Sequence, residues 1–421
     1  MKNYLNDAVR AISESIRFDS SLSSPEEGMP FGRGAADCLN HFLTLANTLG
    51  FETRNYDNYV GEALFGSGEG FAVLAHLDVV PAGAGWNKPP FGGIVQDGRI
   101  WGRGAMDDKG PAIAALFAMK ALKDEGFQPK KTIKLIVGCN EECGWKCIEH
   151  YNEVASMPET GFSPDANFPV IYAEKGIYHV RFAFPVKNGL FTAFSGGERV
   201  NMVCDTCEST PVKLDKKRAD ALGLRIEHGG LRASGKSAHG STPEEGVNAI
   251  LPMLKYYADD ESVARVIACL FDDIYGLKTL ADETGNLTMS PDVIAYENGF
   301  LNVTADVRYP ASLPLTAVTD RLDEFGVTYE EISHQKPIFN DKQSELIQTL
   351  GAVYDEYTGK KHEPIAIGGG TYARALKRGA AFGPEIEGEE VTIHQANEYV
   401  TIDRVEMMIT LYKNALERLT K

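Results

Sequence analysis

The chain has 421 residues and a formal net charge of −17 at neutral pH, and 43% of its residues are hydrophobic. This length exceeds what one ordinary hydrophobic core supports, so we expect a globular protein of two domains. The acidic excess argues against a nucleic-acid partner, because the sequence has no basic stripe that would release counterions from a phosphate backbone.

The sequence also disfavours membrane proteins and secreted proteins. No apolar run reaches the roughly 18 residues that a membrane span requires. Residues 1–18 carry apolar side chains at helical spacing together with early charges, and they lack the apolar centre of a signal peptide. The seven cysteines, an odd number, indicate free thiols, and we therefore expect a cytoplasmic protein.

Helices and strands alternate in the first part of the chain. The predicted elements are helices at 3–17 and 36–49, a buried strand at 71–80, a hairpin at 92–104 that turns at Asp97–Gly98, a helix at 111–126 and a buried strand at 132–140. This rhythm predicts an α/β domain whose mixed, largely parallel sheet is flanked by helices.

The pattern changes near residue 176. Alternating apolar and polar residues predict antiparallel strands at 177–186, 223–235 and 294–310, and helical patterns lie between or after them at 244–259, 262–274 and 314–326. From residue 335 the helical style of the first part returns, at 344–359, 371–379 and 403–419. We therefore predict an α/β domain of residues 1–175 and 335–421, interrupted by an inserted α+β domain of residues 176–334.

The strand at 71–80 carries His76 and Asp78, which lie two residues apart and so on the same side of an extended segment. A metal-binding imidazole that is oriented by a carboxylate has this pattern. For this pair taken alone, a core histidine hydrogen-bonded to its neighbour is the favoured interpretation.

A second acidic motif, Asp107 and Asp108, directly precedes Lys109 at the start of the helix at 111–126. One of the two aspartates could cap this helix, and Lys109 could neutralise it. That interpretation accounts for one aspartate more readily than for both.

A third motif is the paired charge of Glu141 and Glu142 at the end of a buried strand, with no Lys or Arg beside it until Lys146. Two unneutralised carboxylates repel each other and resist desolvation, so a cation must come from elsewhere. Asp165 follows in a loop, and His394 precedes the last helix.

Open α/β sheets build their sites at strand ends, where three of these acidic or histidine positions fall. Two histidines and several carboxylates suit Zn²⁺, with manganese or cobalt as alternatives, and they require no thiols. A dinuclear metal centre would supply the positive charge that Glu141 and Glu142 lack.

Two closely spaced cysteine pairs could also suggest a metal site, but we do not interpret them as one. Cys143 and Cys147 are four residues apart, which is helical spacing, and Cys204 and Cys207 have no second matching pair. We interpret all four as buried structural thiols.

Together the motifs resemble the co-catalytic zinc peptidases that include aminoacylase, carboxypeptidase G and succinyl-diaminopimelate desuccinylase. The shared pattern is H-x-D, then G-R-G-A-x-D-D-K-G, then N-E-E and a late histidine. The segment SPDANFPVIYAEKG is more selective and resembles the PepV-type dipeptidases of bacteria, because most of the family has a glutamate at the ligand position that is Asp165 here. AIGGGTYAR and HQANEYVTID resemble the same subgroup.

The resemblance implies a set of metal ligands. Asp107 would bridge the two ions, His76 and Asp165 would complete one of them, and Glu142 and His394 would complete the other. The preference for Asp107 over Asp108 as the bridge comes from the family pattern, since the spacing alone leaves both open.

The resemblance also implies the catalytic and substrate-binding residues. Asp78 would orient His76, and Glu141 would be the general base that takes a proton from a water bridging the metals and passes it to the leaving amine. In the inserted domain, which would act as a lid, His239 would donate to the oxyanion and Arg308 would hold the substrate carboxylate. The other candidate substrate-binding residues are Asn201, Gly369, Gly370 and Thr371. Arg308 could instead be a charge on the sheet surface, and Asn201 a turn residue.

The implied activity is a dipeptidase that removes the N-terminal residue of unblocked dipeptides, Xaa-His and β-alanyl dipeptides among them. The alternative within the same chemistry is an N-acyl amino acid hydrolase. A dipeptidase should have an acidic group near the substrate amine, and the neighbourhood of Asp165 could provide it. A non-catalytic metal- or peptide-binding relative should lack Glu141, His239 or a ligand, and none is missing. We expect a monomer, because a two-lobed lid would place His239 over its own active site.

Overall fold

The protein is described by a computed structural model that covers residues 2–421, and its chain divides into two compact units. Unit 1 contains the chain up to Tyr172 together with Asn340–Ile365 and Thr371–Lys421. Unit 2 contains Ala173–Phe339 and Ala366–Gly370. The domain limits expected from the sequence, at residues 175 and 334, stay a prediction.

The central sheet of unit 1 is mixed. Within the described residues, the sheet follows the order β1-β2-β6-β3-β7-β22-β9, and β20 and β21 pair with β9 where the chain passes from one unit to the other. The strands are β1 (Glu52–Tyr56), β2 (Val60–Phe65), β3 (Gly70–His76), β6 (Thr132–Gly138), β7 (Thr160–Ser163), β9 (Ile171–Glu174), β20 (Ile338–Phe339), β21 (Ile365–Ile367) and β22 (Arg378–Ala381). The neighbours β6, β3, β7 and β22 run parallel, whereas β1 and β2 are antiparallel additions at one edge.

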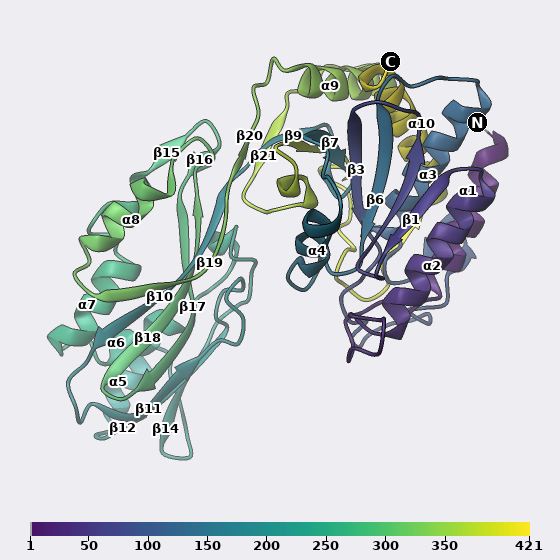
Figure 1. Ribbon diagram of the computed structural model, residues 1–421. Coiled ribbons are helices and arrows are strands. Elements are labelled where there is room, and N and C mark those ends of the chain that lie inside the picture. The colour runs from purple at the N-terminus through teal and green to yellow at the C-terminus, as the bar shows by residue number, and fades with distance from the viewer. Residues whose placement is uncertain (1) are drawn as a thin grey trace. The chain divides into compact units, whose positions relative to one another are not determined.

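Helices cover this sheet. They are α1 (Lys2–Ile16), α2 (Arg33–Thr48), α3 (Lys109–Asp124), α4 (Lys146–Val154), α9 (Glu345–Thr358) and α10 (Ile402–Leu419). The helix α3 is buried along most of its length and packs against α1 and α10, as Figure 1 shows. Its alanine-rich sequence lets neighbouring helices approach closely, which explains why α3 lies in the middle of this layer.

Two sequence predictions in unit 1 need correction. The strand predicted at 71–80 ends at His76, because Leu77 donates its N–H to Gly138 and the next residues leave the ladder. The segment 371–379, predicted as helical, contains only the 3₁₀ turn η3 (Tyr372–Ala375) and the start of β22. Gly379 packs so closely on the carbonyl of Ala373 that a Cβ there would lie 2.1 Å from the oxygen, which brings the strand directly against the turn.

The predicted hairpin is confirmed as β4 (Ile94–Gln96) and β5 (Arg99–Trp101), which are antiparallel. Asp97 and Gly98 both have positive φ, 54° and 71°, as a type I′ turn requires. The strand β24 (Tyr399–Thr401) joins the hairpin on the other side of β5. The remaining short elements of the chain are β8 (Ala166–Asn167) paired with β23 (Pro384–Glu385), β15 (Ala281–Asp282) paired with β16 (Gly285–Asn286), and the 3₁₀ turns η1 (Pro243–Glu245) and η2 (Leu277–Thr279).

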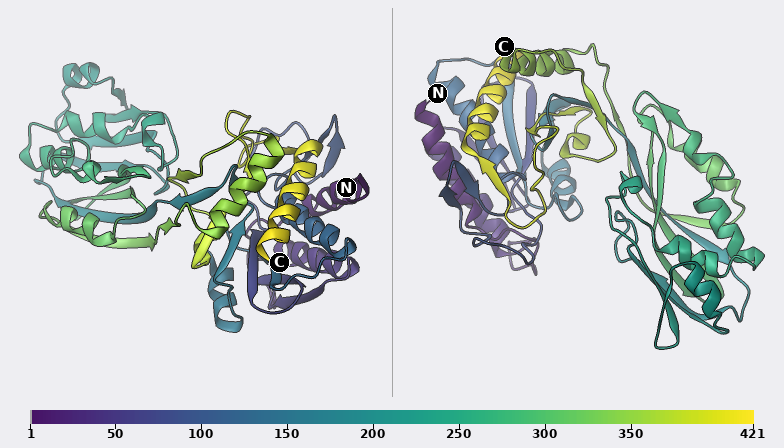
Figure 2. Two further views of the ribbon diagram at one scale, coloured as in Figure 1. Left: turned by 90° about the horizontal axis from the view of Figure 1, so that it is seen from above. Right: turned by 180° about the vertical axis from the view of Figure 1, so that it is seen from behind.

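Unit 2 is an antiparallel sheet with helices on one face, as Figures 1 and 2 show. Its strands are β10 (Gly176–Pro185), β11 (Phe191–Gly196), β12 (Thr206–Pro211), β13 (Arg225–Glu227), β14 (Gly230–Ser234), β17 (Thr288–Glu297), β18 (Phe300–Tyr309) and β19 (Thr328–Gln335). Its helices are α5 (Lys216–Ala221), α6 (Ile250–Tyr256), α7 (Glu261–Leu270) and α8 (Leu315–Asp323). Alternate residues of β10 are buried in the core between sheet and helices, which confirms the predicted antiparallel strands with one exposed face.

These two units confirm the predicted fold class, an α/β domain interrupted by an α+β insert. No helix in residues 2–421 is both long and apolar enough to cross a membrane.

Candidate metal centre and substrate-binding residues

The candidate metal ligands of unit 1 lie at one edge of its sheet. His76 is the last residue of β3, Glu141 and Glu142 follow β6, and Asp165 follows β7. Since these three strands are parallel neighbours, their carboxyl ends bring the side chains together.

Asp107 lies at the centre of the cluster. Its Oδ1 is 3.0 Å from His76 Nε2, and its Oδ2 is 2.9 Å from His394 Nε2. Asp165 Oδ2 approaches the same His76 nitrogen at 3.6 Å, and Glu142 Oε1 approaches the His394 nitrogen at 3.1 Å. The structure therefore forms two groups of three possible metal donors that share Asp107, and these groups match the two ligand sets expected from the sequence.

Asp108 is directed differently from Asp107. It occupies the N-cap position of α3, but its side chain makes no capping bond and instead accepts the backbone N–H of His76 at 3.1 Å. Lys109, proposed as its neutralising partner, donates to the carbonyls of Ser15 and Phe18 at 3.2 and 2.8 Å. The capping interpretation of this motif is therefore wrong.

Asp78 connects the histidine to the paired glutamates. Its carboxylate accepts the backbone N–H groups of Glu141 and Glu142 at 3.0 and 3.1 Å. The His76 Nδ1 atom lies 3.0 Å from the carbonyl oxygen of Asp78 and 3.6 Å from its carboxylate. Asp78 thus fixes the turn that carries both glutamates, and its backbone is the nearer partner of the imidazole.

Glu141 does not belong to either group of possible ligands. Its Oε1 accepts a hydrogen bond from Trp145 Nε1 at 3.2 Å. Loss of hydration on burial, together with the negative charges of Asp165 and Glu142, holds the pKa of Glu141 well above its usual value. A carboxylate that lies beside the donors without joining them, and that binds protons readily, suits proton transfer.

The charges of the cluster fit a divalent cation. Within the part of the chain that the structure describes, no Lys or Arg forms an ion pair with Asp107, Glu142 or Asp165. Burial alone would lower the pKa of His394, but its hydrogen bonds with Asp107 and Glu142 raise that pKa to about 11. A metal ion bound there would compete with protons for both imidazoles, and histidine with carboxylate is a donor set that Zn²⁺ and related ions accept.

The cysteines do not contribute to this cluster. Of the four that the sequence singles out, Cys147, Cys204 and Cys207 are buried as expected, whereas Cys143 is exposed, so the prediction for Cys143 is wrong. Cys143 directly follows the paired glutamates and lies in the loop before α4, which begins at Lys146.

Sequence reasoning missed Glu398, which holds the Asp107 loop in place. This fully buried carboxylate accepts the N–H groups of Met106 and Asp107 at 2.9 and 3.2 Å and pairs with Arg103 at 2.6 Å. The available signal was its place four residues after His394, within HQANEYV.

Unit 2 brings its own candidate residues together. The segments of Asn201 and His239 are paired, since Gly240 donates its N–H to the Asn201 carbonyl at 2.8 Å. A Cβ on Gly240 would lie 2.3 Å from Asp306 Oδ2, so this turn packs directly on that carboxylate. His239 Nδ1 is 2.7 Å from the hydroxyl of Ser241.

Arg308 completes this group. It donates to both oxygens of Asp306 at 2.7 Å and to the carbonyl of Gly368 at 3.1 Å. Both side chains of the pair are buried, so the interpretation of Arg308 as a surface charge is wrong. Asn201 is exposed in a turn, and its alternative interpretation remains open. Of the other substrate-binding candidates, Gly369 and Gly370 belong to unit 2, while Thr371 is buried in unit 1 and caps η3.

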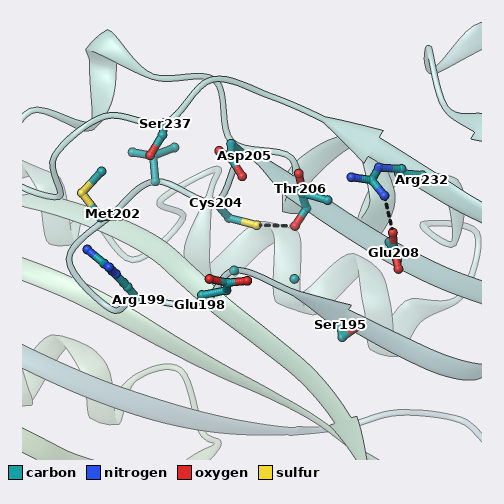
Figure 3. A pocket seen from close by; sticks show the side chains of 13 residues that line it. Ser195, Glu198, Arg199, Met202, Cys204, Asp205, Thr206, Glu208, Arg232 and Ser237 are labelled. Carbon is teal, nitrogen blue, oxygen red and sulfur yellow. Dashed lines mark hydrogen bonds and ion pairs between the residues drawn. The ribbon is translucent and has the colours of Figure 1, made fainter. Parts of the chain in front are cut away.

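Unit 2 also contains a cavity of about 680 Å³, and Figure 3 shows the side chains that line it. Met202 and Ser237 line it, each close in sequence to Asn201 or His239. Cys204 also lines it, and burial raises the pKa of its thiol to about 11, so the thiol stays neutral and donates to the carbonyl of Thr206 at 3.1 Å. Glu198, Arg199 and Asp205 line the cavity as well, so its wall is polar.

The fold, the candidate metal centre of unit 1 and the candidate substrate-binding residues of unit 2 together indicate a metallopeptidase. Residues 72–418 match the family model described as "Peptidase family M20/M25/M40", and the chain belongs to this family. Over an alignment that is 453 positions long with its gaps, it is 35% identical to "Putative dipeptidase YtjP" of Bacillus subtilis (strain 168), covering 99% of this chain and 97% of the relative. It is also 35% identical to "Beta-Ala-Xaa dipeptidase" of Lactobacillus delbrueckii subsp. lactis, covering 99% and 96%.

Solved structures share the fold. Human carnosine dipeptidase 1 superposes with a TM-score of 0.61 at 15% identity, covering 99% of this chain and 97% of that chain. Aminopeptidase PepT from Bacillus cereus ATCC 10987 superposes with a TM-score of 0.61, also at 15% identity, covering 99% of each chain.

Proposed function

We propose that this protein is a metal-dependent dipeptidase that hydrolyses unblocked dipeptides, with Xaa-His and β-alanyl dipeptides among its substrates. The observation that carries the proposal is the pair of three-donor groups that share Asp107 and lack any Lys or Arg counter-ion in the described chain. The dipeptidase names of the relatives, aligned along nearly the whole chain, support the substrate class.

The family binds divalent metals, and we propose two Zn²⁺ ions here, with Mn²⁺ or Co²⁺ as alternatives. Asp107 would bridge them, His76 and Asp165 would hold one, and Glu142 and His394 would hold the other. Divalent ions bound there would polarise the peptide carbonyl and lower the pKa of an attacking water. The absence of thiols from the groups leaves Zn²⁺, Mn²⁺ and Co²⁺ all compatible with the donor set.

Glu141 would act as general base. Its carboxylate would take a proton from the attacking water and later deliver it to the leaving amine. Trp145 keeps one oxygen of Glu141 engaged, and Asp78 fixes the backbone of Glu141, so the other oxygen is held in a defined position. This arrangement leaves Glu142 free to serve as a ligand.

We propose that the group in unit 2 serves the substrate. His239 would donate to the developing oxyanion, and Arg308 would bind the C-terminal carboxylate of the dipeptide. Asp306 already engages two guanidinium nitrogens, so Arg308 is preoriented and would offer its remaining N–H groups. Asn201 and the backbone of Gly369, Gly370 and Thr371 would add polar contacts to the same ligand.

We also propose that the protein is a cytoplasmic monomer. The seven cysteines are all free, which agrees with a reducing compartment. A size measurement in solution at several concentrations would test the monomer, and a stable dimer would contradict it.

The first experiment removes metal with a chelator and restores Zn²⁺, Mn²⁺ or Co²⁺ separately. The substrate panel pairs free dipeptides, including Xaa-His and β-alanyl dipeptides, with N-acetyl amino acids. Glu141→Ala is the inactive control, and Glu149→Ala, an exposed glutamate on α4, is its matched control.

Metal-restored cleavage of free dipeptides only is the expected outcome, and the most effective ion identifies the preferred metal. Cleavage of acetylated substrates only would keep the metal site and change the substrate class to an N-acyl amino acid hydrolase. No cleavage by the metal-loaded protein would indicate a non-catalytic binding protein.

A further inference from the structure

Glu385 is an acidic side chain near the metal-ligand residues that the proposed mechanism does not use. It lies in β23, directly opposite Asn167 of β8 in a parallel pair. The pair is held by backbone hydrogen bonds, such as the one from Phe168 N to Glu385 O at 2.8 Å. Asp165 directly precedes β8, so this ladder fixes Glu385 beside the segment that carries a proposed ligand.

The carboxylate of Glu385 has no cation of its own. Among the described residues its side-chain contact is the amide of Asn167, with Nδ2 3.4 Å from Oε2. Two cations act on it electrostatically, Arg404 and His394. Arg404 is itself bonded to the carbonyl of Pro384 and to Glu389 at 2.6 Å, and His394 is bonded to Asp107 and Glu142. Glu385 is thus a half-buried carboxylate that forms no ion pair among the described residues.

Glu385 lies within electrostatic reach of the metal-ligand residues. Burial first, and then the charges of Asp107 and Asp165, raise the pKa of Glu385 to about 7. It nevertheless belongs to neither group of three donors, whose atoms lie within 4.8 Å of one another. Its place is therefore beside the metal donors and outside their coordination.

The chemistry of the substrate shows what this carboxylate can bind. In a dipeptide the α-ammonium nitrogen is two bonds from the scissile carbonyl carbon, and in a β-alanyl dipeptide it is three bonds away. A carbonyl carbon held at Asp107 and Asp165 brings that ammonium group to the rim of the donor cluster. A partly desolvated carboxylate without a counter-ion provides a charge-assisted hydrogen bond for it.

We propose that Glu385 binds the ammonium group carried by the N-terminal residue of the substrate, either its terminal amino group or a basic side chain. This inference rests on the proposed dipeptidase function and adds its specificity residue. An N-acyl amino acid has no ammonium group at this end, so binding by the terminal amino group would favour free dipeptides over acylated amino acids.

The test compares the wild type, Glu385→Gln and Glu387→Gln, all loaded with the same metal. Glu387 is an exposed glutamate two residues further along and serves as the matched control. The ligands are alanyl-alanine, lysyl-alanine and N-propionyl-alanine, which has the shape of alanyl-alanine without the amino group and is measured as a competitive inhibitor. Bound metal is quantified in every variant.

For Glu385→Gln we expect KM for alanyl-alanine to rise on the order of 10-fold to 100-fold, because a hydrogen bond to a charged group is lost. The inhibition constant of N-propionyl-alanine and the metal content should stay unchanged, and Glu387→Gln should match the wild type. A rise confined to lysyl-alanine would also support the proposal and identify the basic side chain as the group bound.

Equal weakening of all three ligands, no change in any KM, or loss of metal from Glu385→Gln would overturn the inference. These outcomes are separate from failure of the proposed function, which would appear as a metal-loaded wild type that cleaves neither dipeptide. In that case the inference falls with the function on which it rests.

Discussion

The two units each bury a group of carboxylates, and they balance the negative charge in different ways. In unit 2, Asp306 is neutralised by Arg308, a cation that the chain itself supplies through two hydrogen bonds of 2.7 Å. In unit 1, the cationic partners of Asp107, Glu142 and Asp165 among the described residues are two imidazoles, His76 and His394. A buried carboxylate costs several kcal/mol unless it is paired, and three carboxylates outnumber two imidazoles, so the second group suits a cation from solution.

The difference separates a charge balance that folding completes by itself, in unit 2, from one that would depend on a bound ligand, in unit 1. The ion pair of unit 2 is complete on folding, so Arg308, the proposed substrate-binding arginine, would be held in place before any ligand arrives. The cluster of unit 1 would be stabilised further by the proposed metal, so its stability and the proposed activity would depend on the same ligand. The three tryptophans, Trp86, Trp101 and Trp145, all lie in unit 1, so their fluorescence reports on that unit while circular dichroism reports on both.

The largest effect should come from Glu141→Gln. The amide keeps the shape of the side chain but accepts no proton, so kcat for a dipeptide should fall by about 10²-fold to 10⁴-fold. Bound metal should be unchanged, because Glu141 belongs to neither donor group. Kinetics and metal analysis on the same preparation check both statements, with Glu149→Gln as the exposed control. Loss of metal from Glu141→Gln would identify Glu141 as a ligand and reverse its role with Glu142.

The second largest effect should come from removing the carboxylate partner of Arg308, the cation that the chain itself supplies in unit 2. Asp306→Asn leaves the guanidinium of Arg308 buried with a neutral partner, and breaking a buried pair in this way costs about 3–5 kcal/mol of unfolding free energy. The loss should appear in the circular dichroism transition and be small in the tryptophan signal. The matched control is Glu208→Gln, because the Glu208–Arg232 pair is largely exposed and such pairs contribute about 0–1 kcal/mol. A similar loss in both variants would mean that the Asp306 pair behaves as a surface pair.

Metal should produce a smaller effect in the other unit. At a free metal concentration about 100 times its dissociation constant, binding should add about 2.7 kcal/mol to the unfolding free energy of unit 1. Denaturant titrations followed by tryptophan fluorescence, with and without Zn²⁺, measure this shift. The Asp107→Asn variant should lose most of it, since Asp107 is shared by both donor groups. A shift seen only by circular dichroism would place the ion in unit 2.

The same contrast explains what the sequence predicts. Glu141 and Glu142 end a buried strand without a neighbouring cation, so their charge predicts a cation from elsewhere, and the other histidine and acidic motifs then favour a metal. The βαβ rhythm predicts a largely parallel sheet, in which the strand of His76 and the strand before Glu141 end at the same edge. Arg308 was found through its resemblance to a family motif, because one arginine in an alternating strand has no local signal.

Contacts between distant segments could not be read from the sequence. Glu398 reaches Asp107 across 291 residues, and the β8–β23 ladder joins Asn167 to Glu385 across 218. Asp108 turns toward the backbone of His76 because β3 passes beside it, which no local propensity encodes. Each of these depends on tertiary pairing, where short-range capping and spacing rules give no information.

The smallest expected change per step of the measurement, a slope with pH, concerns a second acid of unit 2, Asp292, which forms no ion pair among the described residues. It is fully buried, accepts a hydrogen bond from Ser290 at 2.5 Å, and its Oδ2 has no hydrogen-bond partner among the described residues. Burial, reinforced by the charge of Asp306, raises the pKa of Asp292 to about 8, against about 3.9 in an unfolded chain. Between about pH 4 and pH 8, the folded protein therefore keeps a proton on Asp292 that the unfolded chain has already released.

Because the folded state binds the extra proton, its advantage is complete at low pH and is lost as the pH rises toward about 8. The unfolding free energy of unit 2 should fall by up to about 1.4 kcal/mol per pH unit in this window from this group. Asp292→Asn cannot ionise, so circular dichroism melts from pH 5.5 to 8 should show a flatter dependence than the wild type. The exposed Glu227→Gln on β13 should keep the wild-type slope. If Asp292→Asn also keeps it, Asp292 is charged in the folded protein, and Arg308 must then balance two carboxylates instead of one.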